Sequence, residues 1–191
     1  MNQAAALQAL IRVLEGLHIR YLIGGSVASS SRGIPRSTVD TDLVVRIVPL
    51  QTAALVKALG ADWYADAEFA REAVERGRAF NVIHIPSGHK IDIFPAIDPF
   101  NASELERAGI QTLTVPGGSV QCFVATTEDM ILAKLRWYRN GGETSERQWL
   151  DIADMLVVNR DLDTAYLAKW AKQLGVADLL ERAVNETREE I

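Results

Sequence analysis

Three aspartates of this sequence occupy positions from which their carboxylates could share a metal ion. Asp40 and Asp42 lie two residues apart in a segment typical of a strand, so both side chains project from one face. Asp92 lies between Ile91 and Ile93, where an apolar residue would be expected. Neighbouring carboxylates repel unless they are protonated or share a cation, and an oxygen-preferring divalent ion such as Mg²⁺ is the usual partner. Each aspartate alone is typical of a strand end or a surface, so the prediction depends on the segments around them.

A pair of glycines upstream strengthens the prediction of a site. Gly24 and Gly25 follow a predicted short strand, 20–23, and precede a short helix that Ser26 can cap. Such a turn offers backbone N–H groups and the positive end of a helix dipole to phosphate oxygens. A Gly-Gly turn by itself is commonly only a tight turn, but here a strand with two carboxylates follows it. The combination predicts a phosphate cradle beside a metal site.

The loop between these segments carries further polar residues. Arg36, Thr38, Asp40 and Asp42 take alternate positions of an extended segment, so all four share one face. We therefore expect Arg36 and Thr38 to contact a nucleotide, since a guanidinium pairs well with phosphate. Arg32 could pair with a triphosphate in the same way, but it is equally typical of a solvated surface residue.

A second group of charged residues lies in the C-terminal part. Lys134 falls on one predicted helix, and Arg147 and Asp151 fall on one face of the next. One interpretation is an exposed ion pair between Arg147 and Asp151, and the other is a functional role in which Asp151 orients Lys134. The sequence does not decide between them.

The elements that must position these residues follow from periodicity and turn signals. A helix is expected over 3–17, a buried strand over 38–47, helices over 49–59 and 65–76, and a hairpin from 79–85 and 90–94. Two short strands follow at 110–115 and 120–124, and then four helices over 127–139, 145–158, 163–173 and 175–188. The chain is thus predicted to have an α/β core over 1–125 and a helical extension over 126–191 packed on that core.

Composition restricts the class of protein. The 191 residues are 48% hydrophobic and 24% charged, as in ordinary globular proteins. The single cysteine, Cys122, excludes an intrachain disulfide and favours the reducing cytoplasm, and no apolar segment is long enough to cross a membrane. The net charge of −5 argues against a broad surface for RNA.

The motifs G-G-S at 24–26, R-S-T-V-D-T-D at 36–42 and I-D-I-F at 91–94 resemble those of the polymerase-beta-like nucleotidyltransferase superfamily. The form of the second motif is similar to the branch with abortive-infection toxin-type and small antibiotic nucleotidyltransferases. The resemblance covers about the first 95 residues. It implies an α/β (α+β) fold in which helices flank a mixed sheet, with the helical extension following.

The resemblance also implies roles for the site residues. Asp40 and Asp42 would bind two Mg²⁺ ions, with Mn²⁺ as an alternative, and Asp92 would complete the triad and act as general base. Gly25 and Ser26 would hold the outer phosphates of a nucleoside triphosphate. Toxin-type relatives also carry a lysine and a later arginine-aspartate helix, so the resemblance implies that Lys134 would contact the triphosphate.

Three classes of function are weighed. The first is an active nucleotidyltransferase that moves a nucleoside monophosphate to a hydroxyl of tRNA, protein or a small molecule and releases pyrophosphate; a toxin-type enzyme would also have a cognate antitoxin. The second is a catalytically silent nucleotide-binding or antitoxin-like module of the same fold. The third is a helix-rich adaptor whose acids only cap or pair. The three aspartates favour the first class.

Overall fold

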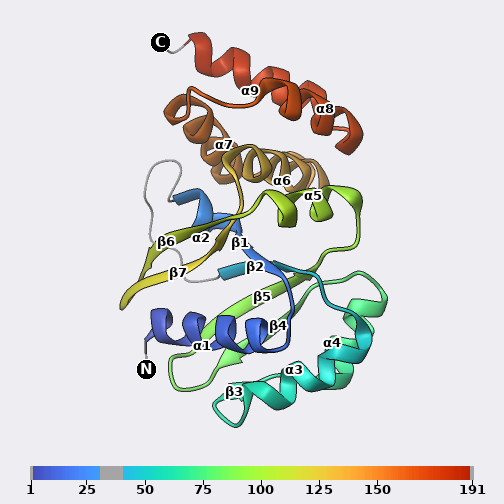
Figure 1. The fold of residues 1–191 in the computed structure, drawn as a ribbon. Helices are drawn as coiled ribbons and strands as arrows, with labels where there is room; N and C mark the ends of the chain where they lie inside the picture. Colours follow the sequence, from blue (N-terminus) through green and yellow to red (C-terminus); the bar gives the residue numbers. More distant parts are fainter. Residues whose placement is uncertain (1, 31–40, 190–191) are drawn as a thin grey trace. The chain divides into compact units, whose positions relative to one another are not determined.

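The computed structural model describes residues 2–30 and 41–189 (Figure 1). The described residues fall into two compact units. The first contains those within 1–27 and 38–125, and the second those within 28–37 and 126–191. All the described strands belong to the first unit.

The first unit is built on a mixed β-sheet. Among the described residues seven strands join in the order β3-β4-β5-β2-β1-β7-β6. The pairs β2·β5 and β1·β7 are parallel, and the other neighbours are antiparallel. The mixed sheet confirms the predicted fold class. The strands are β1 (Tyr21–Gly24), β2 (Thr41–Val45), β3 (Trp63–Tyr64), β4 (Phe80–His84), β5 (His89–Pro95), β6 (Gly109–Val115) and β7 (Gly118–Val124).

Side chains alternate between a buried and a half-exposed face along β2 and β5, because successive residues of a strand point to opposite faces. The buried positions of β2 and β5 hold mainly apolar residues, among them Leu43, Ile91 and Ile93, which are fully buried. Helices α1 (Gln3–Gly16), α3 (Thr52–Leu59) and α4 (Ala67–Glu75) lie together on one side of the sheet, with α5 (Pro99–Arg107) on the other (Figure 1). The half-exposed positions of β2 and β5 include Asp42 and Asp92.

Most predicted elements of the first unit are present, with small changes at their ends. The predicted helix over 49–59 begins as the 3₁₀ turn η1 (Pro49–Gln51) before α3. The predicted short helix after the two glycines is α2 (Gly25–Ser30), which begins at the second of them. The sequence analysis missed α5 and β3. Helix α5 has clear signals, since the Asp98 carboxylate accepts from the N–H of Asn101 and Pro99 occupies the first turn.

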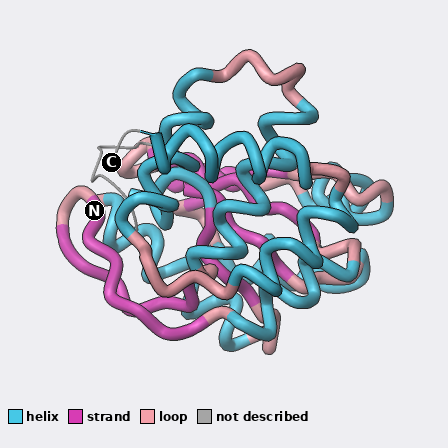
Figure 2. The backbone as a smooth tube through the Cα atoms, turned by 90° about the horizontal axis from the view of Figure 1, so that it is seen from above, coloured by secondary structure: helices cyan, strands magenta, loops and turns pink. Residues whose placement is uncertain are grey.

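The hairpin of β6 and β7 forms one edge of the sheet, and the predicted strands over 110–115 and 120–124 do pair with each other. The side chain of Asn2 donates to the Gly117 carbonyl at 2.9 Å, and the N–H of Ala4 donates to Pro116 at 3.2 Å. Figure 2 shows the start of α1 beside the turn of this hairpin. These contacts fix the hairpin turn to the helix that covers the sheet.

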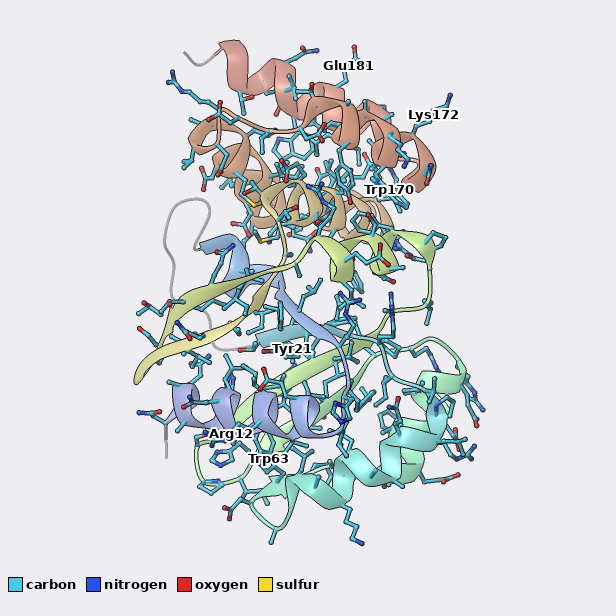
Figure 3. The ribbon with its side chains drawn as sticks, in the orientation of Figure 1. Arg12, Tyr21, Trp63, Trp170, Lys172 and Glu181 are labelled. Carbon is cyan, nitrogen blue, oxygen red and sulfur yellow. The ribbon has the colours of Figure 1, made fainter. Side chains whose placement is uncertain are left out.

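The second unit is helical, as predicted for this part of the chain. Helix α6 (Thr127–Asn140) packs on α7 (Glu146–Val158) and α8 (Thr164–Leu174), and α9 (Ala177–Glu189) packs on α7 and α8. Gly175 ends α8 in the left-handed conformation with φ +69°. The buried residues between these helices include Ile152, Met155, Leu167, Leu179 and Trp170, which is labelled in Figure 3.

None of the helices in the described part of the chain has the length and apolar character needed to span a membrane.

Two histidines are buried where β4 and β5 pair. His84 and His89 face each other across the hairpin, and each is almost fully buried. The His84 ring lies edge-on to Trp63, with the ring centroids 5.0 Å apart, and its Nδ1 lies 2.8 Å from the Ser87 hydroxyl. Burial lowers the pKa of His84 below its ordinary value of 6.5, because the charged imidazolium is poorly solvated there. The folded protein therefore favours the neutral form of His84 more than the unfolded chain does.

This burial makes the stability of the fold depend on pH. The unfolded chain binds a proton at His84 near pH 6.5, whereas the folded chain binds it only at lower pH. The contribution of His84 is fully present above about pH 6.5 and is lost as the pH falls toward the folded pKa. We expect the free energy of unfolding, measured with denaturant from pH 8 to pH 5, to fall less steeply in His84→Gln than in the wild type. The exposed His18 offers the control: His18→Gln should keep the wild-type slope, and a flat wild-type profile would contradict the prediction.

Candidate functional site

Asp42 and Asp92 occupy matching positions on two neighbouring parallel strands. Asp42 of β2 is the register partner of Asp92 of β5, and both lie on the half-exposed face of the sheet. Neighbouring strands lie about 4.8 Å apart, so the two side chains leave the sheet side by side. The structure thus brings together two of the three predicted acids, which are 50 residues apart in the sequence.

The glycine turn lies on the other side of Asp42. Gly24 ends β1 and is the antiparallel register partner of Asp42. Gly25 follows with φ +60°, a conformation that favours glycine. A Cβ on Gly25 would lie 2.6 Å from Cγ and 2.8 Å from Cβ of Asp42 and would also overlap its Oδ2. The Asp42 side chain therefore fits against Gly25 because that residue has no side chain.

A lysine faces Asp92 from the same strand. Lys90 and Asp92 are two residues apart on β5 and share a face, and Lys90 Nζ lies 2.9 Å from Asp92 Oδ2. The side chains are 39% and 23% exposed, respectively. On β4, the register partner of Asp92 is Asn81, which is exposed. The sequence analysis missed Lys90, although its spacing from Asp92 was enough to place it on the same face.

Several predicted site residues fall in the part of the chain that the structure does not describe. These are Asp40, Arg32, Arg36 and Thr38. Ser26 is half-buried at the second position of α2. Within residues 2–30 and 41–189, no group of three His, Cys, Asp or Glu side chains is arranged to hold a metal ion. The predicted third carboxylate, Asp40, lies outside the described residues.

The predicted residues of the C-terminal part lie in the second unit. Lys134 of α6 pairs with Asp151 of α7, with Nζ 2.8 Å from Oδ2, and both side chains are nearly buried. Of the two partners that the sequence offered for Asp151, the structure therefore has Lys134, and Asp151 is buried. Arg147 is exposed near the start of α7.

The described acids of the first unit are of the type that can bind a cation. Two carboxylates in register present oxygen ligands, which Mg²⁺ and Mn²⁺ prefer. Gly24 and Gly25 have no side chains, and the Asp42 side chain occupies the space where a side chain of Gly25 would lie. The oxygen donors of Asp42 and Asp92 fit a hard divalent cation. The lack of a side chain at Gly25 leaves room for the Asp42 carboxylate.

Comparison with known proteins finds solved structures that superpose on this chain. No family model matches the sequence, and no curated protein matches it. A solved structure of an antigenic nucleotidyltransferase-like protein from Paracoccidioides brasiliensis superposes with a TM-score of 0.51 at 18% identity, covering 95% of this chain and 91% of that one. The antibiotic-resistance factor ANT(2'')-Ia is 15% identical, with a TM-score of 0.49 and coverage of 98% and 97%. A CCA-adding enzyme solved with ATP is 14% identical, with a TM-score of 0.39 and coverage of 97% and 46%.

The chain has the nucleotidyltransferase fold. The fold agrees with the mixed sheet flanked by helices that the resemblance at 24–26, 36–42 and 91–94 implies.

The close approach of Asp42 to Gly25 generates a prediction. Gly25→Ala should displace the Asp42 side chain, because the new Cβ overlaps it, and should also place alanine at positive φ. Gly175→Ala is the matched control, since it has φ +69° but open space around it. We expect a loss of unfolding free energy of roughly 1 kcal/mol at Gly175 and roughly 1–3 kcal/mol more at Gly25, measured by urea denaturation. Equal losses at the two glycines would show that Asp42 does not depend on Gly25.

Proposed function

We propose that the chain is a metal-dependent nucleotidyltransferase that moves a nucleoside monophosphate from a nucleoside triphosphate to an acceptor hydroxyl. The oxygen of the acceptor forms a bond to the α-phosphorus, the bond from that phosphorus to the bridging oxygen breaks, and pyrophosphate leaves. The observation that carries this proposal is the register of Asp42 and Asp92 beside the Gly24–Gly25 turn. The nucleotidyltransferase fold supports the same reading.

Asp42 and Asp92 would hold the cation, together with Asp40 as the proposed third ligand. The bound Mg²⁺ or Mn²⁺ would neutralise charge on the triphosphate and on the leaving pyrophosphate. Support from the described residues is the in-register pair of oxygen donors on a face that remains half-exposed. The number of ions, proposed as two, follows from the superfamily resemblance.

Asp92 is the proposed general base. Its carboxylate oxygen would take the proton of the acceptor hydroxyl as the new bond forms, and the hydroxyl must then lie within hydrogen-bond distance. Asp92 is 23% exposed in its side chain, and its β4 partner Asn81 is exposed, so a molecule in solution can reach this edge of the pair. The acceptor would be tRNA, a protein or a small molecule.

The triphosphate is proposed to lie on the Asp42 side of the site. Gly24, Gly25 and Ser26 would contact its outer phosphates through backbone N–H groups and the Ser26 hydroxyl. The position of these residues beside Asp42 supports this arrangement. Further proposed contacts of the triphosphate are Arg36, Thr38 and Lys134, with Arg32, Arg147 and Asp151 in supporting positions. If the protein is a toxin-type enzyme, a cognate antitoxin is a proposed partner.

One experiment tests this function without knowledge of the acceptor. The protein is incubated with each α-labelled nucleoside triphosphate, Mg²⁺ and a cell extract, and label is followed into RNA, protein and small molecules. We expect label in one of the three fractions, with release of pyrophosphate. Nucleotide binding without any transfer or pyrophosphate release would instead identify a silent nucleotide-binding module.

Substitution of the two carboxylates should abolish this transfer. We expect Asp92→Asn to lower the rate by about 10²–10⁴-fold, as loss of a general base does, and Asp42→Asn to lower it at least as much. Neither amide can replace an anionic oxygen ligand, but both match the shape of the acid, so circular dichroism should remain that of the wild type. Asp161→Asn, at an exposed position of the second unit, is the control and should keep full activity. Wild-type turnover in either site variant would refute the assignment.

A further inference from the structure

We propose that the positive charge of Lys90 acts on the Asp42–Asp92 pair. Lys90 weakens the binding of a free divalent ion and strengthens the binding of the ion together with a nucleotide. This inference rests on the proposed function, because it takes Asp92 as a ligand of the metal. It assigns to Lys90 a positioning and selecting role.

Lys90 and Asp92 are both residues of strand β5, so the sheet fixes where their side chains begin. The two residues are separated by Ile91, which is fully buried and holds this part of β5 in place. The ammonium reaches Oδ2 of Asp92 at 2.9 Å from the same face. The strand fixes the origins of both side chains, so the two charged groups leave the sheet on the same face.

The pair also differs from the surface ion pairs of the molecule. Arg71 and Glu68, for example, pair on the exposed side of α4, where water screens the charges and the interaction contributes little. Asp92 is only 23% exposed and has a second carboxylate, Asp42, beside it in register. A single ammonium here offsets the repulsion of two acids, so its charge acts on the whole pair.

The same charge opposes a metal ion. A divalent cation bound by Asp92 and the ammonium of Lys90 share one carboxylate and repel each other at short range. The triphosphate reverses this effect, since a metal–triphosphate complex keeps a net negative charge that Lys90 attracts. Lys90 thus lowers the affinity for the free ion and raises the affinity for the metal–nucleotide complex. A lysine with only a structural role would have no such opposite effects.

The test compares two affinities in the full-length chain. Binding of Mn²⁺ alone, and of Mn²⁺ with a non-hydrolysable nucleoside triphosphate, is measured by titration calorimetry for wild type, Lys90→Met, Lys90→Arg and Lys57→Met. Lys57 is exposed on α3, so Lys57→Met removes the same charge away from the site. We expect Lys90→Met to bind free Mn²⁺ about tenfold more tightly and the metal–nucleotide complex severalfold more weakly. Lys90→Arg and Lys57→Met should match the wild type.

Each other outcome overturns the inference in a distinguishable way. If Lys90→Met binds both ligands more weakly or equally, Lys90 is only structural and the proposed function stands. If the wild type does not bind Mn²⁺ at all, or binds it equally well after Asp92→Asn, the metal site itself fails and the inference fails with it. Should Lys90→Met fold poorly, Lys90→Gln carries the same expectation, because it removes the charge and keeps a hydrogen-bond donor for Asp92.

Discussion

Two like charges are held side by side by the sheet, and the rest of the first unit accommodates them. At about 5 Å and an effective dielectric constant of about 20, two carboxylates repel by roughly 3 kcal/mol. Such an arrangement persists if a proton or a cation offsets the repulsion and the backbone cannot relax. Lys90 supplies one positive charge at 2.9 Å from Asp92. A divalent ion brought by the nucleotide is the proposed second source of positive charge.

The covered face of the sheet prevents that relaxation. Leu43, Ile91 and Ile93 flank the two acids along their strands and are fully buried under the helices of the other side. A shift of one residue in either strand would place an aspartate in this apolar core and an apolar residue in water. The same alternation that forms the core therefore fixes the acids in register. Gly25 completes the arrangement, since any side chain there would occupy the space of the Asp42 carboxylate.

Local patterns in the sequence predicted most elements and none of their long-range pairings. The alternation around Asp42 and Asp92 placed each acid on a strand, but their register joins residues 50 positions apart and depends on the tertiary fold. Strand β3 is two residues long, too short for any periodicity to show. Helix α5 was missed although Asp98 and Pro99 are ordinary start signals, because its apolar residues are few. Likewise, the sequence left Asp151 between two partners, and the packing of α6 on α7 shows that it contacts Lys134.

Asp42 and Asp92 are proposed to bind one shared cation. A double-mutant cycle of Asp42→Asn and Asp92→Asn, with the dissociation constant of Mn²⁺ as the measured quantity, tests this claim most directly. If the carboxylates share the ion, either single substitution removes most of the affinity and the double variant loses little more. Independent, additive losses, or affinities that stay at the wild-type value, would contradict a shared cation.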